Sequence, residues 1–292
     1  MMEQDTKKQA GDLYSTSMSM RNYRMLSDFI YNEVGIKLPP NKKIMLEARI
    51  RKRLKILNIN SFSEYCDYIF SPHGIETELI HMIDVITTNK TDFFREPAHF
   101  DYLTQTALPE LINSSAHGIH RKIRLWSAGC STGEEPYTLS IVLSEFGEKY
   151  SGFNFSILAT DISTEVLQKA AKGIYELEKI EGIPILLKHK YLMKNKDKNK
   201  KFVRIVPELR ALINFRRLNL MDSNFGIEEP MEIIFCRNVI IYFDRATQER
   251  LLNKFYKQLT FGGYLFMGHS ETLHGLSIPL VQVAPTIYRK LE

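Results

Sequence analysis

The run IRLWSAGCSTGEEP, residues 123–136, decides the fold. It begins with an apolar segment of strand length, continues through a loop that contains Gly129 and Gly133, and ends in Glu134 and Glu135, which open a helix. A strand, a glycine-containing loop and a helix in this order are typical of a parallel α/β sheet that binds its ligand where the strands end. We therefore predict an α/β domain with a ligand at this loop.

The pattern repeats along the rest of the chain. Further apolar runs of strand length alternate with helical stretches, which is the arrangement of consecutive βαβ units. The predicted strands cover residues 123–129, 155–161, 232–238 and 264–268, and the predicted helices cover residues 134–148, 163–173 and 244–260.

The remaining segments give the predicted domain organisation. Apolar residues at helical spacing, such as Leu46 and Ile50, predict a helical N-terminal domain at 19–88. A Lys-rich stretch interrupts the sheet pattern and predicts a small antiparallel β insertion. The predicted parts are a flexible tail at 1–18, the helical domain at 19–88, a linker and helix at 89–121, and the α/β sheet domain at 122–292 with the insertion at about 180–217.

Composition sets the class of protein. The chain has 292 residues, of which 44% are hydrophobic and 25% charged, with a net charge of +5, as in ordinary globular proteins. No apolar run is long enough to span a bilayer, and none follows the N-terminal lysines as in a signal peptide, so we expect a cytoplasmic protein. Cys66, Cys130 and Cys236 have no CxxC spacing, which favours reduced, packed thiols.

The residues after the first two strands indicate the ligand. Two carboxylates at the start of a helix would repel a pyrophosphate, but they suit a cationic or hydroxyl-rich ligand such as S-adenosylmethionine. Asp161 ends the second strand, where an acidic residue often accepts hydrogen bonds from ribose hydroxyls. Two simpler interpretations stay open: the glycine loop as a tight turn, and Asp161 with Ser163 as a helix cap.

Four segments together resemble a known family. The runs TTNKTDFFRE (87–96), WSAGCSTGEEPY (126–137), ATD (159–161) and FCRNVIIYF (235–243) resemble the CheR family of chemotaxis receptor methyltransferases. The resemblance covers nearly the whole chain after residue 20 and implies a Rossmann-like S-adenosylmethionine-dependent methyltransferase sheet with a helical N-terminal domain and a small β insertion. It implies methyl transfer to glutamate carboxylates of bacterial chemoreceptors, giving a methyl ester and S-adenosylhomocysteine, in chemotactic adaptation.

The resemblance also implies site residues. Arg95 and Tyr242 correspond to the residues that face the methyl group and the incoming carboxylate, although a core role for Tyr242 stays open. A glutamate acceptor is already an anion at neutral pH, because its pKa is about 4.3, so no general base is needed. The implied cofactor contacts are Asn89, Thr91, Arg95, Glu134, Asp161, Asn219, Leu220, Arg237 and Asn238.

Partner surfaces follow from charge. The basic segment 37–55 leaves Arg49, Lys52 and Arg53 as predicted receptor-recognition residues on an exposed helix face, while an ordinary solvated face is the alternative. In some family members the insertion binds a receptor tail peptide through a glycine-containing turn. The turn KNKDKNKK here has no glycine, so we do not expect tail binding.

Other functions fit less well. We expect no metal, and we assign His269, near the ligand edge, a structural role. A nicotinamide-dependent oxidoreductase would need a GxGxxG turn, which is absent, and the mild overall charge disfavours a nucleic-acid-binding protein. A cofactor-binding adaptor without turnover is a third alternative. Nothing in the sequence demands more than a monomer.

Overall fold

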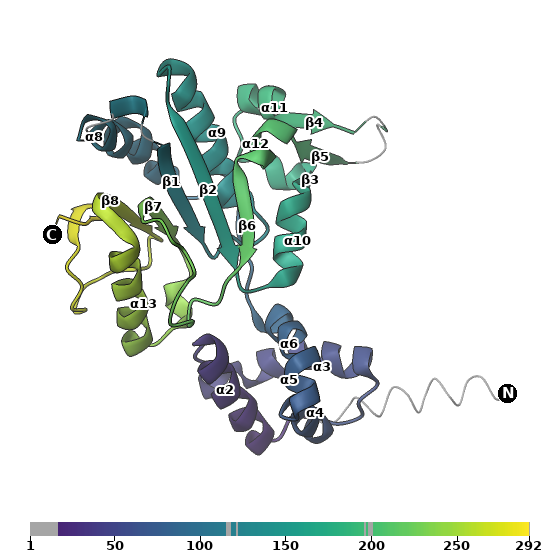
Figure 1. Ribbon diagram of the computed structural model, residues 1–292. Helices are drawn as coiled ribbons and strands as arrows, with labels where there is room; N and C mark the ends of the chain where they lie inside the picture. The colour runs from purple at the N-terminus through teal and green to yellow at the C-terminus, as the bar shows by residue number, and fades with distance from the viewer. Residues whose placement is uncertain (1–16, 115–117, 121, 196, 198–200, 292) are drawn as a thin grey trace. The chain divides into compact units, whose positions relative to one another are not determined.

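The computed structural model describes residues 17–114, 118–120, 122–195, 197 and 201–291. The chain divides into two compact units, Met1–Thr88 and Asn89–Glu292 (Figure 1). Residues 1–16 of the predicted tail lie outside the described residues. Met18 is buried, and its N–H donates to Glu47 Oε2 at 3.0 Å.

The described part of the first unit is helical. Three of its α-helices begin at a serine side chain that accepts a backbone N–H: Ser19 accepts from Asn22, Ser61 from Glu64 and Ser71 from Gly74. The apolar stripes of these helices form the core of the unit. The elements are α2 (Met20–Val34), η1 (Pro40–Lys42), α3 (Lys43–Leu57), α4 (Phe62–Ile69), α5 (Pro72–Thr77) and α6 (Leu79–Ile86).

The second unit is built on a seven-stranded sheet in the order β6-β2-β1-β7-β8-β10-β9. The first five strands in this order are parallel, and β10 pairs antiparallel with both β8 and β9. The strands are β1 (Lys122–Ala128), β2 (Asn154–Asp161), β6 (Ile213–Arg217), β7 (Met231–Cys236), β8 (Leu259–Met267), β9 (Val281–Ala284) and β10 (Ile287–Arg289).

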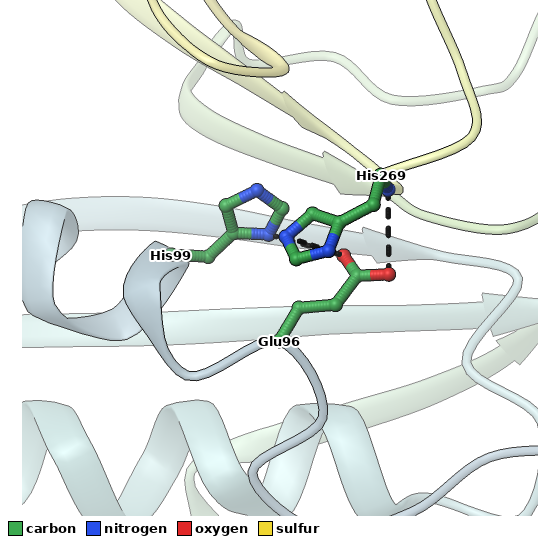
Figure 2. A group of neighbouring side chains, drawn as sticks. All are labelled: Glu96, His99 and His269. Carbon is green, nitrogen blue, oxygen red and sulfur yellow. Dashed lines mark hydrogen bonds and ion pairs between the residues drawn. The ribbon is translucent and has the colours of Figure 1, made fainter.

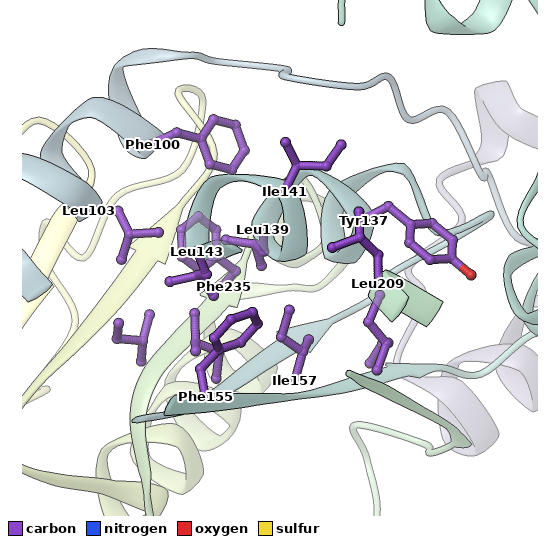
Figure 3. Close-up of a cluster of buried hydrophobic side chains, with 14 of the residues drawn as sticks. Phe100, Leu103, Tyr137, Leu139, Ile141, Leu143, Phe155, Ile157, Leu209 and Phe235 are labelled. Atoms are coloured by element: carbon purple, nitrogen blue, oxygen red, sulfur yellow. The ribbon is translucent and has the colours of Figure 1, made fainter. Parts of the chain in front are cut away.

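Both faces of this sheet are covered. Ile233 and Phe235 of β7 point to one apolar cluster, and Ile234 and Cys236 point to another on the opposite face. Figure 3 shows the first cluster, where Phe155 and Phe235 lie beneath side chains of α9. The helices of this unit are α7 (Ala98–Tyr102), η2 (Leu103–Ala107), α8 (Leu108–Asn113), η3 (Gly118–His120), α9 (Glu134–Lys149), α10 (Thr164–Lys172), η4 (Leu177–Ile180), α11 (Ile185–Tyr191), α12 (Pro207–Ala211), η5 (Ile240–Tyr242) and α13 (Arg245–Gln258).

A second, three-stranded antiparallel sheet has the order β3-β5-β4. It contains β3 (Ile174–Glu176), β4 (Leu192–Lys194) and β5 (Phe202–Ile205). The predicted fold class, with its helical domain, mixed α/β sheet and small antiparallel sheet, is therefore confirmed. One strand is placed differently: the segment expected in the insertion at about 180–217 includes β6, which pairs with β2 in the large sheet.

None of the helices among the described residues has the length and apolar character needed to cross a bilayer.

Candidate active site

The candidate site lies where the five parallel strands end. Because parallel strands end at a common edge, the loops after β1, β2, β6, β7 and β8 meet there. These loops, the element ends that flank them and the segment 89–96 carry all nine predicted cofactor contacts.

The loop after β1 brings buried carboxylates to this edge. Gly133, with φ 98°, is the N-cap of α9, and Glu134 follows it with 1% of its surface exposed. Glu134 Oε2 accepts a hydrogen bond from Thr132 Oγ1 at 2.6 Å. Burial raises the pKa of the Glu134 carboxyl above its ordinary value. A cationic or hydrogen-bond-donating ligand beside Glu134 would offset this cost of burial.

Asp161, the last residue of β2, joins two loops. Its Oδ2 accepts the Ser131 N–H at 2.8 Å, and its Oδ1 accepts the Ser163 N–H at 3.0 Å. The cap of α10 is Ser163, whose hydroxyl accepts the Val166 N–H. An ionised carboxylate only accepts hydrogen bonds, so this position suits donors such as ribose hydroxyls.

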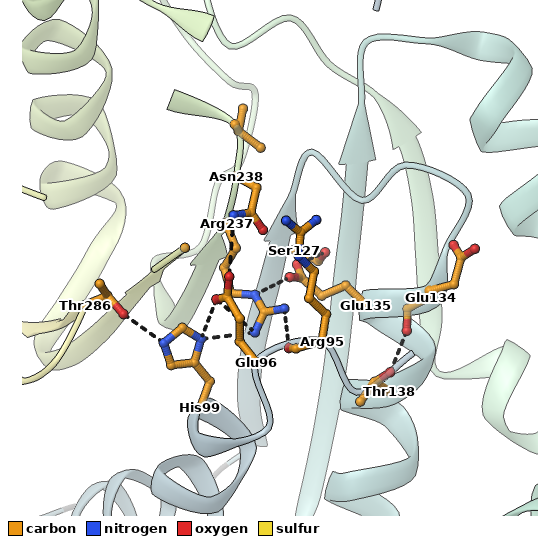
Figure 4. A network of polar contacts seen from close by, with 12 residues as sticks. Arg95, Glu96, His99, Ser127, Glu134, Glu135, Thr138, Arg237, Asn238 and Thr286 are labelled. Carbon is orange, nitrogen blue, oxygen red and sulfur yellow. Dashed lines mark hydrogen bonds and ion pairs between the residues drawn. The ribbon is translucent and has the colours of Figure 1, made fainter. Parts of the chain in front are cut away.

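Arg237, directly after β7, is the centre of a buried polar network. Its side chain is 2% exposed and donates in three directions: Nε to Glu135 Oε2 at 2.9 Å, Nη1 to His99 Nδ1 at 3.0 Å, and Nη2 to the Arg95 carbonyl at 2.7 Å. Figure 4 shows the guanidinium between Glu135 on one side and His99 on the other. The resemblance implies that Arg237 contacts the cofactor. In the structure its side chain instead binds three protein groups, one of which is the backbone carbonyl of Arg95.

The segment that carries Arg95 is anchored at several points. The Phe94 N–H donates to Thr138 Oγ1 at 3.1 Å, and Ser131 Oγ donates to the Asn89 carbonyl at 3.0 Å. Phe94 and Glu96 have left-handed backbone, with φ 54° and 57°. Such conformations are costly for residues other than glycine and gather at functional sites. The Arg95 side chain is half-buried, and its Nη1 donates to the Lys90 carbonyl at 3.1 Å.

The other predicted residues occupy the loops after β6 and β7. Asn219 accepts the Met221 N–H through Oδ1 at 3.0 Å, and Leu220 is buried. Asn238 has left-handed backbone with φ 59°, and its Nδ2 donates to Glu96 Oε1 at 3.5 Å. Tyr242 is the last residue of η5 and is partly exposed. Its exposure is compatible with the predicted contact to the acceptor carboxylate.

Two histidines and a glutamate meet beside this network. Glu96, His99 and His269 each offer one ligand-type atom, all within 4.8 Å of one another (Figure 2). Burial and the nearby Arg237 charge lower the pKa of His99 to about 4, so its ring is neutral. Its Nδ1 already accepts from Arg237, whose Nη1 also lies 3.9 Å from Glu96 Oε2. A metal ion here would have to displace the guanidinium. The trio is better described as a contact between the segment that enters α7, which carries Glu96 and His99, and the turn after β8, which carries His269.

Some functional contacts were not predicted. The sequence predicts Glu135 and Glu134 as a joint ligand group, but Glu135 accepts from Ser127 Oγ at 2.7 Å and from Arg237 Nε at 2.9 Å. The predicted site residues do not include His99 or Glu271. Local sequence offers no signal for them, because their partners lie in distant parts of the chain.

The basic helix α3 differs from the expectation. The prediction that Arg53 is exposed is wrong: it is 8% exposed, and its Nε and Nη2 donate to Glu78 Oε1 and Oε2 at 2.8 and 2.7 Å. Arg49 is partly buried and donates to the Thr87 carbonyl and to Thr88 Oγ1, both at 3.0 Å. Lys52 is exposed, as expected.

Comparisons with known proteins cover both units. The family profile "CheR methyltransferase, all-alpha domain" matches residues 21–87, and "CheR methyltransferase, SAM binding domain" matches residues 89–288. The "Chemotaxis protein methyltransferase" of Borreliella burgdorferi is 42% identical over 91% of this chain and 92% of its own length. The protein of the same name from Escherichia coli K12 is 34% identical over 93% and 91%. Among solved structures, PKMT2 from Rickettsia typhi in complex with AdoHcy has a TM-score of 0.33 and 15% identity, over 56% of this chain and 24% of that one.

Proposed function

This chain belongs to the CheR family of chemotaxis protein methyltransferases, and on that premise we propose that it transfers methyl groups from S-adenosylmethionine to glutamate side chains of chemoreceptors. The products would be a glutamate γ-methyl ester and S-adenosylhomocysteine. The observation that carries the proposal is the pair of buried carboxylates, Glu134 and Asp161, at one sheet edge beside the anchored Arg95 segment.

The donor set fits S-adenosylmethionine. Glu134 and Asp161 are acceptors suited to the hydroxyls and the positive charge of this ligand. Gly129 has φ 83°, and a Cβ added to it would lie 2.5 Å from a methyl group of Val239. The loop after β1 therefore packs against Val239 so closely that only glycine fits at this position. We assign the cofactor contacts to Asn89, Thr91, Arg95, Glu134, Asp161, Asn219, Leu220, Arg237 and Asn238, with Arg237 acting mainly through its backbone and through the groups it holds.

The chemistry asks little of the protein beyond alignment. When bound, S-adenosylmethionine supplies a methyl group on a positively charged sulfur. The acceptor glutamate is ionised at neutral pH, because its pKa is about 4.3, so the chain need not remove a proton. Opposite charges disappear as the methyl group moves, so the exclusion of water favours the reaction. We assign to Arg95 and Tyr242 the positioning of the carboxylate in line with the methyl group.

The substrate surface is revised from the sequence expectation. Arg53 and Arg49 are held by groups of their own unit, which leaves Lys52 on the exposed face of α3 as the principal contact for an acidic helical receptor. The positive charge of an exposed lysine attracts an acidic receptor over a long range, which raises the rate at which the two proteins meet, and salt weakens this attraction. We propose a cytoplasmic, monomeric enzyme that does not insert into the membrane and does not depend on a receptor tail peptide.

One assay tests the proposal. Membranes that contain chemoreceptors are incubated with radiolabelled S-adenosylmethionine and either the wild-type protein or Arg95→Ala. We expect label on the receptor that is released as methanol by base, which identifies a carboxylate ester, and we expect almost none with Arg95→Ala. The proposal would be contradicted by label that resists base. It would also be contradicted if the wild-type protein binds S-adenosylhomocysteine but labels no receptor.

A further inference from the structure

Glu271 lies in the turn after β8 with its carboxylate buried, at 4% exposure. Four backbone N–H groups donate to it. Oε1 accepts from Val239 and Ile240, both at 2.9 Å, and Oε2 accepts from Asn238 at 2.9 Å and from Gly268 at 2.6 Å. Three of the donors, Asn238, Val239 and Ile240, run from the turn after β7 into the first residue of η5, so a side chain from one loop fixes the backbone of another.

The donors are those that a short helix leaves unsatisfied at its start. Val239 is the N-cap of η5 and Ile240 its first residue, so their N–H groups have no partner within the element. A carboxylate at this position also complements the positive end of the peptide dipoles. Glu271 therefore caps η5 from outside and fixes the start of the segment that runs from Asn238 to Tyr242, and the Tyr242 N–H in turn donates to the Val239 carbonyl at 3.3 Å.

The contact between the two loops is close and specific. Asn238 holds a left-handed backbone with φ 59°, which costs energy for asparagine unless its surroundings fix it. Gly268 approaches so closely that an added Cβ would lie 2.8 Å from the Asn238 nitrogen. Burial raises the pKa of the Glu271 carboxyl, while the four N–H donors favour its ionised form. Because four backbone N–H groups point at one buried carboxylate, the Glu271 side chain fixes the backbone of the turn after β7 relative to the turn after β8.

We propose that Glu271 is a positioning residue for methyl transfer, which places Asn238 against the cofactor and Tyr242 against the acceptor carboxylate. The inference rests on the proposed function, because it concerns residues assigned there. The four hydrogen bonds of the Glu271 carboxylate all come from backbone N–H groups, so it acts through the residues that it holds.

Glu271→Gln tests the inference, because an amide keeps the size of the side chain but turns a donor NH₂ toward N–H groups. Glu232→Gln is the matched control. Glu232 is also fully buried and also accepts a backbone N–H, from Arg124 at 2.8 Å, but it lies near the amino end of β7. We expect Glu271→Gln to lower kcat by about tenfold or more with an unchanged receptor KM, since small misplacements of reacting groups cost that much.

Affinity for S-adenosylhomocysteine, measured by calorimetry, should fall severalfold in Glu271→Gln and stay unchanged in Glu232→Gln. The control should lose thermal stability while it keeps its kcat within about twofold. If Glu271→Gln does not fold, Glu271→Asp, which keeps the charge but withdraws it by one methylene, is compared in the same way. Equal kcat losses in both buried-carboxylate variants, or a kcat near wild type in the Glu271 variant, would overturn the inference. Failure of the wild type to label receptors would instead overturn the proposed function.

Discussion

Arg53 and Glu78 form a two-pronged ion pair inside the helical unit, with Nε to Oε1 at 2.8 Å and Nη2 to Oε2 at 2.7 Å. The Tyr65 hydroxyl adds a third donor to Glu78 at 2.9 Å. The pair joins α3 to the start of α6 within the core. Arg53, which the charge pattern predicts as a receptor contact, is thus a structural residue of its own unit.

Arg53→Ala should destabilise the helical unit by about 3 kcal/mol or more, because it leaves the Glu78 carboxylate buried without its ion-pair partner. Urea unfolding followed by circular dichroism measures the change. Lys52→Ala, one residue away but exposed, is the control and should change stability by less than about 0.5 kcal/mol. Similar unfolding midpoints for the two variants would show that the pair contributes little.

Lys52→Glu should raise the KM for receptor methylation several-fold at low salt without changing kcat or the melting temperature, since the exposed charge acts on encounter. The effect should shrink as salt rises from about 0.05 to 0.5 M. Lys172→Glu on α10 makes the same charge change at another exposed position and should leave KM unchanged. Equal effects of the two reversals would indicate only a response to net charge.

The fold could be predicted where a segment carries its own pattern. The strands β1, β2 and β7 are apolar runs followed by glycine or polar residues, and the helices between them show apolar residues at helical spacing. The edge strand β6 was harder to place, because INFRR is partly polar and follows a Lys-rich stretch. Strands β9 and β10 are short, and their sequences lack a comparable apolar run.

The site was predictable only in part, for a physical reason. Asp161 ends a strand and Glu134 begins a helix, and the sequence pattern predicts both positions. Whether a charged side chain is buried depends instead on its ion-pair partner, which the local sequence does not identify. Arg53 lies on the apolar stripe of α3 three residues after Ile50, and what makes its burial tolerable is Glu78, 25 residues away in the chain. Arg237 likewise depends on Glu135 and His99, which no local spacing connects to it.

Arg237→Lys should lower kcat/KM for methyl transfer by about a hundredfold, because a lysine cannot donate to Glu135, His99 and the Arg95 carbonyl at the same time. Initial rates over a range of receptor and cofactor concentrations give the value. Arg124→Lys is the matched control, since Arg124 also makes several bonds to glutamates but lies near the amino ends of the strands. A loss confined to stability in both variants would contradict a role for Arg237 in the site.

His99 should make stability depend on pH. Its pKa is lowered to about 4 in the folded protein, against about 6.5 in the unfolded chain, chiefly by burial and then by Arg237. The unfolded state therefore binds the extra proton first. Stability from this residue is fully present above about pH 6.5 and declines as the pH falls toward 4, by about 3 kcal/mol in all. His99→Gln should flatten this part of a plot of unfolding free energy against pH. An unchanged slope would show that other groups cause the pH dependence.

Asp161→Asn should decide between the two interpretations of the residue at the end of β2. If Asp161 binds ribose hydroxyls, the loss of its charge should weaken S-adenosylhomocysteine binding by about ten- to a hundredfold, as expected for hydrogen bonds to an ionised group. Ser163→Ala is the matched variant: it removes the hydroxyl that accepts the Val166 N–H, so it should cost about 1 kcal/mol of stability and leave affinity unchanged. Calorimetric titration and urea unfolding of both variants separate the effects. If Asp161→Asn binds as tightly as wild type and only unfolds more easily, then Asp161 serves to join the loops after β1 and β2, and the cofactor's hydroxyls must be bound elsewhere at this edge.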